Sequence, residues 1–337
     1  MSALDDVFAK INKSMKEEVC FIGSAQRAKF EMLPSGILTV DYATYGGLPM
    51  GRIHEFGGEQ HAGKTLLSLA FVASAQKHYP DKKAVFVDAE SRFDPKWASK
   101  IGVDVDNLYV FNPMTQSAEE IFDAIIEFIK TGEVSILVLD SIGHLVSGKV
   151  IDESIEKGNY GGIAASLTRF SNIISGLLAK YNTCMICLNQ VREDLGSMFP
   201  VYSTPGGKAF KHACSTRIEL RRGSFIDDKG TDVSQSVENP AGNRVNFVLH
   251  KLSNASLDRK KGSFTLRYLD GIDLYGDLVE IAMKYDIITQ AGAWYSINID
   301  GEEKFKVAGK ASIINKLKED EEMYNLVFEK CKEKFND

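Results

Sequence analysis

Gly58-Glu59-Gln60-His61-Ala62-Gly63-Lys64-Thr65 is a complete G-x-x-x-x-G-K-T phosphate-binding loop. It follows the apolar stretch 52–56 and directly precedes the helix-like run 66–71, so the sequence predicts the strand–loop–helix context that the motif requires. In that context successive backbone N–H groups point at the α and β phosphates. Lys64 reaches the β and γ phosphates, and the Thr65 hydroxyl is offered to Mg²⁺. We therefore predict nucleoside triphosphate binding, rather than a simple glycine turn before a helix.

Length and composition indicate a globular protein of about two domains. The 337 residues exceed the roughly 250–300 at which single cores stop growing. No apolar run reaches the roughly eighteen residues of a membrane helix, and the N-terminus lacks the features of a secretion signal. The odd count of five cysteines argues against a disulfide framework and for a cytoplasmic location. A net charge of −6 restricts any DNA contact to a local surface.

Cys184 and Cys187 form a C-x-x-C motif inside the apolar, strand-like run 183–188. No second pair of metal ligands has suitable spacing. We interpret both residues as buried strand cysteines, in preference to a zinc or redox site.

The pattern along the chain predicts three parts. Residues 1–32 form a small N-terminal module whose helix, over 5–15, needs a partner surface for its apolar positions. Residues 33–269 alternate strand and helix signals, which predicts an α/β domain with a mostly parallel sheet covered on both faces. Residues 270–337 are expected to form a small C-terminal domain that ends in one charged helix over 312–335.

Within the central part, apolar runs and periodicity predict the individual elements. The expected buried strands span 83–88, 134–140, 183–189 and 215–221; the expected helices span 118–129 and 163–181; antiparallel edge strands are expected over 244–251 and 262–269. Two polar, irregular stretches, 148–162 and 191–207, come after core strands, where ligand-contacting loops emerge in open α/β sheets.

Two acidic strand ends are candidates for the chemistry of the nucleotide. The apolar run 136–140 has the form of a Walker B element that ends in Asp140. We expect its strand to lie next to the strand of the phosphate loop, so that Asp140 holds the Mg²⁺ shell through water. Glu90, at the end of 83–88, is the candidate general base for the attacking water. Without further support it would be interpreted as an exposed loop acid.

Several short runs are shared, in order, with one family. They are Gly46-Gly47-Leu48-Pro49-Met50-Gly51-Arg52-Ile53, Asp88-Ala89-Glu90 with Asp94-Pro95, Asn189-Gln190, Met198-Phe199, Gly206-Gly207 and Ala291-Gly292-Ala293-Trp294-Tyr295-Ser296. From about residue 5 to residue 330 the chain resembles the bacterial-type RecA recombinases. The resemblance implies a RecA-type P-loop ATPase core, with a small N-terminal helical module and a small C-terminal α+β domain.

The resemblance implies an ATPase that uses ATP and Mg²⁺, polymerises on single-stranded DNA and exchanges strands with a homologous duplex. By the same resemblance Glu90 is the hydrolytic base, and Gln190 senses the γ phosphate and signals to the loop that follows. Asp94 and Trp97 flank the adenine, with Trp97 where the family commonly has Tyr. Further copies in a helical filament are the implied protein partners; repressor or loading proteins are further candidates, and no membrane is implied.

The two irregular stretches become DNA-binding loops, near 153–160 and 191–206. Single strands are held by backbone N–H groups and cations, with apolar or aromatic side chains between bases. The candidate DNA-binding residues are Tyr160, Arg169, Arg192, Met198, Phe199, Gly206 and Gly207.

The chain departs from the family on a late strand. The family usually has two lysines there that reach the neighbouring subunit's γ phosphate, whereas this chain has Leu249 in the first place and keeps only Lys251 as a catalytic candidate. We expect His250 to face the other way along the strand. The other departures are Glu193 and Asp194 in the second loop, and His212 in place of an aromatic residue. Our hypothesis is a divergent branch, encoded by a phage or mobile element.

The sequence leaves two other functions open. The first is a filament-forming, DNA-coating protein with weak ATPase activity, because one interface lysine is missing. The second is a ring-shaped DNA motor, which the N-terminal connector helix disfavours.

Overall fold

The computed structural model describes residues 2–16, 20–21, 31–148, 150, 163–194, 201–234 and 236–336. The chain divides into two units, Met1–Glu31 and Met32–Asp337. None of the helices in the described ranges combines the length and the apolar character needed to cross a membrane.

The first unit contains helix α1 (Ala3–Met15), which confirms the helix expected there. Its start is fixed by a capping box. The Ser2 hydroxyl accepts a hydrogen bond from the Asp5 N–H at 3.2 Å, and the Asp5 carboxylate accepts one from the Ser2 N–H at 2.6 Å. No residue of α1 is buried, and Leu4, Val7 and Met15 are exposed by 61%, 49% and 62%. Among the described residues, the apolar positions of α1 are therefore half-buried at most.

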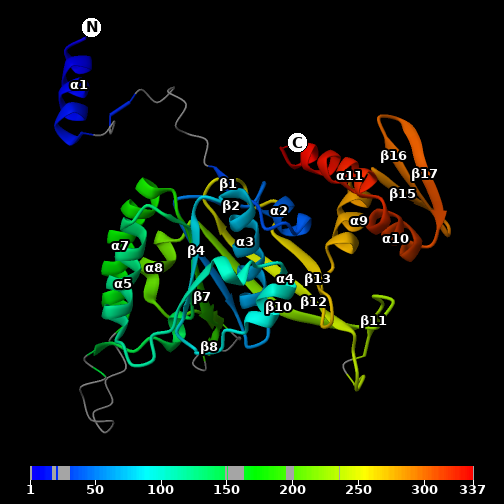
Figure 1. The fold of residues 1–337 in the computed structure, drawn as a ribbon, viewed down its shortest axis with the longest axis horizontal. Coiled ribbons are helices and arrows are strands. Elements are labelled where there is room, and N and C mark those ends of the chain that lie inside the picture. The colour runs from blue at the N-terminus through cyan, green and yellow to red at the C-terminus, as the bar shows by residue number, and fades with distance from the viewer. Residues whose placement is uncertain are drawn as a thin grey trace. The chain divides into compact units, whose positions relative to one another are not determined.

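The second unit is built on a ten-stranded, mostly parallel sheet, as predicted (Figure 1). Its parallel strands, in spatial order, are β5 (Leu108–Phe111), β4 (Lys83–Asp88), β6 (Val134–Asp140), β7 (Cys184–Gln190), β3 (Ile53–Gly58) and β10 (Thr216–Ile226). The antiparallel strands β12 (Gly242–Leu252), β13 (Lys261–Arg267) and β14 (Gly271–Ile272) continue the sheet beyond β10, and β11 (Asp232–Val233) pairs with β10. The antiparallel edge strands expected from the sequence are thus confirmed.

The strand order corrects one prediction. The strand that ends in Asp140, β6, does not lie next to β3, the strand of the phosphate loop, because β7 pairs with both and separates them. All three strands are apolar, buried runs, and such a pattern carries no information about which strands are neighbours.

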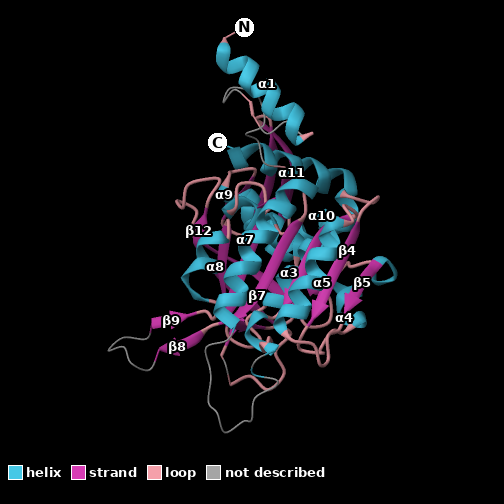
Figure 2. Ribbon diagram, turned by 90° about the vertical axis from the view of Figure 1, so that its left-hand side faces the viewer, coloured by secondary structure: helices cyan, strands magenta, loops and turns pink. Residues whose placement is uncertain are grey.

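Helices cover both faces of the sheet (Figure 2). One face packs against α2 (Leu38–Ala43), α3 (Lys64–His78) and α4 (Pro95–Ile101), and the other against α5 (Ala118–Lys130), α7 (Ile163–Tyr181) and α8 (Gly207–Ala213). Successive residues of β6 alternate between these cores: Ile136 and Val138 join the first, and Leu137 and Leu139 the second. Cys184 and Cys187 are fully buried in β7, as predicted.

Short elements complete this part of the chain. They are β1 (Met32–Leu33), β2 (Leu48–Pro49), β8 (Arg192–Asp194), β9 (Val201–Ser203) and the single 3₁₀ turns η1 (Val105–Asn107) and η2 (Ile142–His144).

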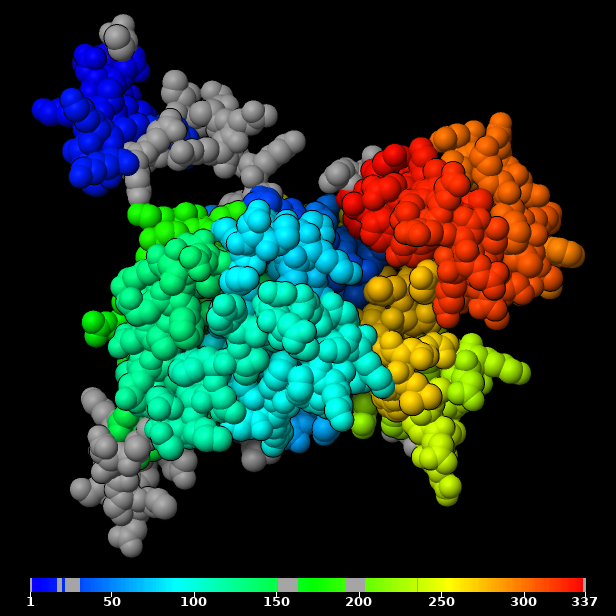
Figure 3. Space-filling view, viewed as in Figure 1, coloured from blue at the N-terminus to red at the C-terminus, as the bar shows by residue number. Residues whose placement is uncertain are grey.

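The C-terminal elements have a core of their own and form one lobe, coloured orange to red in Figure 3. They are α9 (Leu274–Lys284), the antiparallel strands β15 (Ile288–Ala291), β16 (Trp294–Ile299) and β17 (Glu302–Ala308), and helices α10 (Lys310–Glu319) and α11 (Glu321–Glu333), followed by the turn η3 (Lys334–Asn336). The prediction of one helix over 312–335 is wrong. Asp320 adopts an extended backbone and caps α11 by accepting a hydrogen bond from the Met323 N–H at 2.9 Å.

A buried acid joins this lobe to the sheet domain. Asp277 of α9 accepts hydrogen bonds from both the backbone N–H, at 3.0 Å, and the hydroxyl of Thr39 in α2. Burial is the main cause that raises the pKa of Asp277 to about 7, and that of nearby Asp41 to about 6.

These raised pKa values predict how stability depends on pH. Because the folded protein holds the Asp277 proton more tightly than the unfolded chain, this contribution to stability is present at low pH and is lost as pH rises towards about 7. We expect an Asp277→Asn variant, measured by urea unfolding between pH 5 and 8, to lose less stability over that range than the parent. The difference should be on the order of 1–4 kcal/mol. Equal slopes in the variant, the parent and an exposed Asp81→Asn control would contradict this role.

Candidate nucleotide-binding and catalytic site

The phosphate loop joins the end of β3 to the start of α3, as the sequence predicted. Only glycine fits its first position, because a Cβ on Gly58 would lie 2.4 Å from the carbonyl oxygen of Leu220. Gly63, with a φ of +96°, sits at the N-cap of α3. The Lys64 ammonium donates to the carbonyl oxygens of Gly58 and Glu59 at 2.9 and 2.6 Å. The loop therefore presents its lysine and the helix N-terminus at one end of the sheet.

The pairing of the strands places four residues near this end of the sheet. Gly58 of β3 pairs with Gln190 of β7, and Asp140 of β6 pairs with Asp88 of β4. Residues 60–65 of the loop then line a cavity of about 470 Å³ together with Glu90, Asp140 and Gln190. The predicted nucleotide residues Asp94 and Trp97 line the same cavity.

Thr65 and Asp140 form an oxygen pair suited to Mg²⁺. The Thr65 hydroxyl donates to the Asp140 carboxylate at 2.8 Å, although β6 is not adjacent to β3. Burial raises the pKa of Asp140 to about 6, an effect that the Thr65 hydrogen bond opposes, and burial also lowers the pKa of Lys64. A hydroxyl beside a carboxylate is the ligand chemistry that Mg²⁺ prefers, so these residues fit the ion.

Glu90 follows β4 and is shielded, with 14% of its side chain exposed. Its Oε1 accepts a hydrogen bond from the Ser141 hydroxyl at 2.9 Å and lies 2.8 Å from Nδ1 of His144. Its Oε2 lies 3.3 Å from the Arg92 guanidinium. Glu90 is therefore a fixed acid in the cavity rather than an exposed loop acid. Sequence reasoning missed Ser141 and His144, which carry no motif of their own.

Aromatic side chains also line the cavity. Asp94 caps α4 by accepting hydrogen bonds from the N–H groups of Lys96 and Trp97 at 2.8 and 3.2 Å, which fixes the helix that carries the Trp97 ring. Tyr268, just after β13, also lines the cavity and donates to Asn243 at 3.0 Å. Sequence reasoning missed Tyr268, because only the strand order brings it near the phosphate loop.

Comparison with known proteins identifies the family. The model of the RecA N-terminal domain matches residues 2–273, and the model of the RecA C-terminal domain matches residues 276–336. The chain is 33% identical over 334 residues to Protein RecA of Aquifex aeolicus (strain VF5), covering 98% of this chain and 92% of that protein. The chain belongs to the RecA family. It is therefore a recombinase of the RecA type, in a nucleotide-binding family, and the resemblance inferred from its motifs is confirmed.

The stretch expected to form the second DNA loop of this RecA-type protein is not wholly irregular. Strands β8 and β9 pair antiparallel, with Arg192 opposite Ser203, and Figure 2 shows the pair projecting from the main sheet. Tyr160, Met198 and Phe199 lie outside the described residues, as does the side chain of Arg192.

The other candidate DNA-binding residues lie on two helices. Arg169 is exposed on α7. Gly206 caps α8 with a φ of +108°, and Gly207 begins that helix. A Cβ on Gly206 would lie 2.7 Å from a methyl group of Leu167, so a larger residue would displace α8 from α7.

The late strand of this RecA-type chain is irregular at His250. Arg217 of β10 pairs with Lys251 and Ile218 pairs with Leu249, so His250 is an extra residue in a β-bulge. The bulge breaks strict alternation: Leu249 is fully buried, whereas the side chain of His250 is 42% exposed and Lys251 is partly exposed. His250 lies 2.6 Å from Glu219, and Lys251 donates to the carbonyl oxygen of His212 at 2.7 Å.

The buried position of Leu249 predicts that the missing lysine cannot simply be restored. Leu249→Lys would bring an unpaired ammonium into the core and should destabilise the protein by roughly 3 kcal/mol or more. Leu249→Met, which conserves volume, should cost less than about 1.5 kcal/mol. Urea unfolding measures both. A Leu249→Lys variant as stable as the parent and faster in ATP hydrolysis would mean that this side chain reaches the surface.

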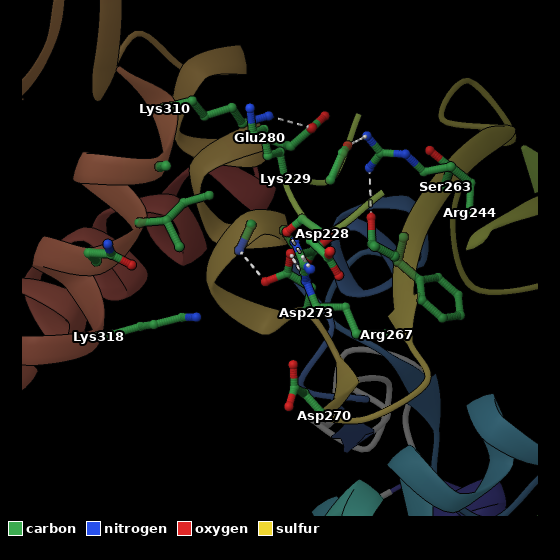
Figure 4. Close-up of a pocket in the computed structure, with 18 residues that line it drawn as sticks. Asp228, Lys229, Arg244, Ser263, Arg267, Asp270, Asp273, Glu280, Lys310 and Lys318 are labelled. Atoms are coloured by element: carbon green, nitrogen blue, oxygen red, sulfur yellow. Dashed lines mark hydrogen bonds and ion pairs between the residues drawn. The ribbon is translucent and has the colours of Figure 1, made fainter. Parts of the chain in front are cut away.

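A second cleft, of about 270 Å³, lies between β13, α9 and α10 (Figure 4). Several of the charged side chains that line the cleft form ion pairs or hydrogen bonds with other lining residues. The contacts are Lys310–Glu280 at 2.8 Å, Arg267–Asp273 at 3.4 Å and Arg244–Thr265 at 2.6 Å. This cleft lies between the C-terminal lobe and the sheet. It shares no lining residue with the nucleotide cavity.

Proposed function

We propose that this RecA-type recombinase couples the binding and hydrolysis of ATP, with Mg²⁺, to polymerisation on single-stranded DNA and to strand exchange with a homologous duplex. The observation that carries the proposal is the meeting of the phosphate loop, Asp140, Glu90 and Gln190 at one sheet edge. Gln190 is followed directly by the stretch 191–207, the candidate DNA loop. The five free cysteines support a cytoplasmic location.

The roles of the site residues follow from their contacts. Lys64 moves from the loop carbonyls to the β and γ phosphates, and Thr65 with Asp140 holds Mg²⁺. The ion, when bound, offsets negative charge on the phosphate oxygens. Glu90 orients the attacking water and accepts its proton. Trp97 and Tyr268 offer aromatic faces to the base.

The order of the DNA loop is proposed to depend on the nucleotide. Gln190 ends a buried strand, so a hydrogen bond from its side chain to the γ phosphate fixes the point from which residues 191–207 leave the sheet. Ordering of a segment by a γ phosphate is a common switching mechanism. Lys251 is proposed to act on the nucleotide of a neighbouring subunit, and the exposed apolar side chains of α1 support self-assembly.

The DNA role of the second loop is tested by Phe199→Ala. Aromatic stacking on bases contributes roughly 1–3 kcal/mol per base, about 5- to 150-fold in affinity. We expect strand exchange to fall by about tenfold or more, with ATP affinity unchanged. Fluorescence-based strand exchange and titration with a labelled ATP analogue measure the two. Unchanged exchange would remove Phe199 from this role.

The burial of Leu249 favours one alternative: a filament that coats DNA and hydrolyses ATP weakly, because a cation is missing at the subunit interface. Measuring ATP turnover with and without single-stranded DNA separates the two. Stimulation by DNA supports the recombinase. ATP-dependent filaments without stimulated turnover support the coating protein.

A further inference from the structure

The carboxylate of Glu90 is held on one oxygen by the turn that follows β6. Its Oε1 accepts a hydrogen bond from the Ser141 hydroxyl at 2.9 Å and lies 2.8 Å from Nδ1 of His144, and this nitrogen is itself hydrogen-bonded to the Ser141 hydroxyl at 3.0 Å. The imidazole is not enclosed, because 37% of the His144 side chain is exposed. A solvent-accessible histidine therefore holds the acid that faces the phosphate loop.

The same turn also contacts the strand that ends in Gln190. A Cβ built on Gly143 would lie 3.9 Å from both Cβ and Cγ of Gln190, which places the turn η2 directly against that side chain. Gly143 and His144 are neighbours, so a shift of η2 moves the contact between His144 and Glu90 and the contact with Gln190 together. The turn is thus a physical link between the two side chains.

We propose that His144 is a positioning residue for ATP hydrolysis: together with Ser141, it fixes the orientation of the Glu90 carboxylate. This proposal rests on the proposed role of Glu90 as general base. Both contacts are made to Oε1, so neither of them occupies Oε2, which is left to face the attacking water.

Other charged groups share this corner of the site. Glu90 and Arg92 come from the segment after β4, Asp88 and Asp140 from the strand ends, and Lys64 from α3; β7 contributes Gln190 at this end. The role is therefore assigned to His144 only if changes to that residue alone lower kcat.

The test compares His144→Ala with His144→Asn. The asparagine amide can donate near the position of Nδ1. For His144→Ala, kcat at pH 7.5 should fall by roughly tenfold to a hundredfold with little change in KM for ATP, because the base loses its orientation. For His144→Asn, kcat at pH 7.5 should stay within about threefold of the parent, since a hydrogen-bond donor is kept. His78→Asn, far from the site, is the matched control.

Two outcomes overturn the proposal: a parental kcat in His144→Ala, or a loss of kcat in His144→Asn as large as that in His144→Ala. Glu90→Gln, measured alongside, separates this failure from failure of the proposed function. If Glu90→Gln hydrolyses ATP at the parental rate, the general-base role itself is wrong. If Glu90→Gln is inactive and adding His144→Ala changes nothing further, His144 acts through Glu90, as proposed.

Discussion

Replacing Glu90 with Gln is expected to slow ATP hydrolysis by roughly a hundredfold to ten-thousandfold while ATP affinity stays nearly intact. The amide has the shape of the carboxylate and can still accept a hydrogen bond from Ser141, which lies 2.9 Å from Oε1 in the parent. It cannot accept the proton of the attacking water. Phosphate release with saturating ATP, Mg²⁺ and single-stranded DNA measures the effect.

The matched control for this experiment is Glu127→Gln, on the exposed face of α5, which should hydrolyse ATP as the parent does. Hydrolysis at the parental rate in Glu90→Gln would contradict the general-base role. A large loss of ATP affinity in that variant would instead assign Glu90 to binding.

Lys64→Ala has the second large expected effect. In the proposed function the ammonium of Lys64 binds the phosphates, and in the structure it lies within hydrogen-bond distance of two loop carbonyls. Removing one partner of a buried charge pair costs roughly 2–5 kcal/mol, or about 30-fold or more in affinity. We expect ATP binding, followed by calorimetry, to weaken by at least that factor. ATP-dependent filaments should then be absent.

Because Lys64 also contacts the loop backbone, urea unfolding of Lys64→Ala must show that the fold is intact. Lys64→Arg keeps the charge but not the compact shape of the ammonium, and should recover binding only in part. Parental ATP affinity in Lys64→Ala would contradict phosphate binding by this loop.

Much of the fold could be predicted because its signals are local. The strand that ends at Asp140 and the helix from Ile163 to Tyr181 match their predicted ranges, since apolar runs and 3.6-residue periodicity depend only on neighbouring positions. The glycines of the loop over 58–65 likewise indicate its backbone geometry. These features depend on sequence neighbours and not on contacts between distant segments.

The predictions that failed depended on contacts between distant segments. The insertion of β7 between β3 and β6 is a property of strand pairing. The bulge at His250, which the sequence does not indicate, is another such property. Tyr268 joins the nucleotide cavity, and His144 reaches Glu90, only through such pairing. The helix break at Asp320 could not be predicted for another reason. An acidic residue in a charged, helical pattern is also compatible with the interior of a helix. Only the extended backbone angles of Asp320 show that it caps α11.

Strand exchange between a single strand and a homologous duplex, with ATP and Mg²⁺, tests the central claim most directly. The parent protein should give a joint product that requires homology, and Lys64→Ala, folded but unable to bind ATP, should give none. ATP-dependent filaments on the single strand without any exchange product would contradict the claim and identify a coating protein.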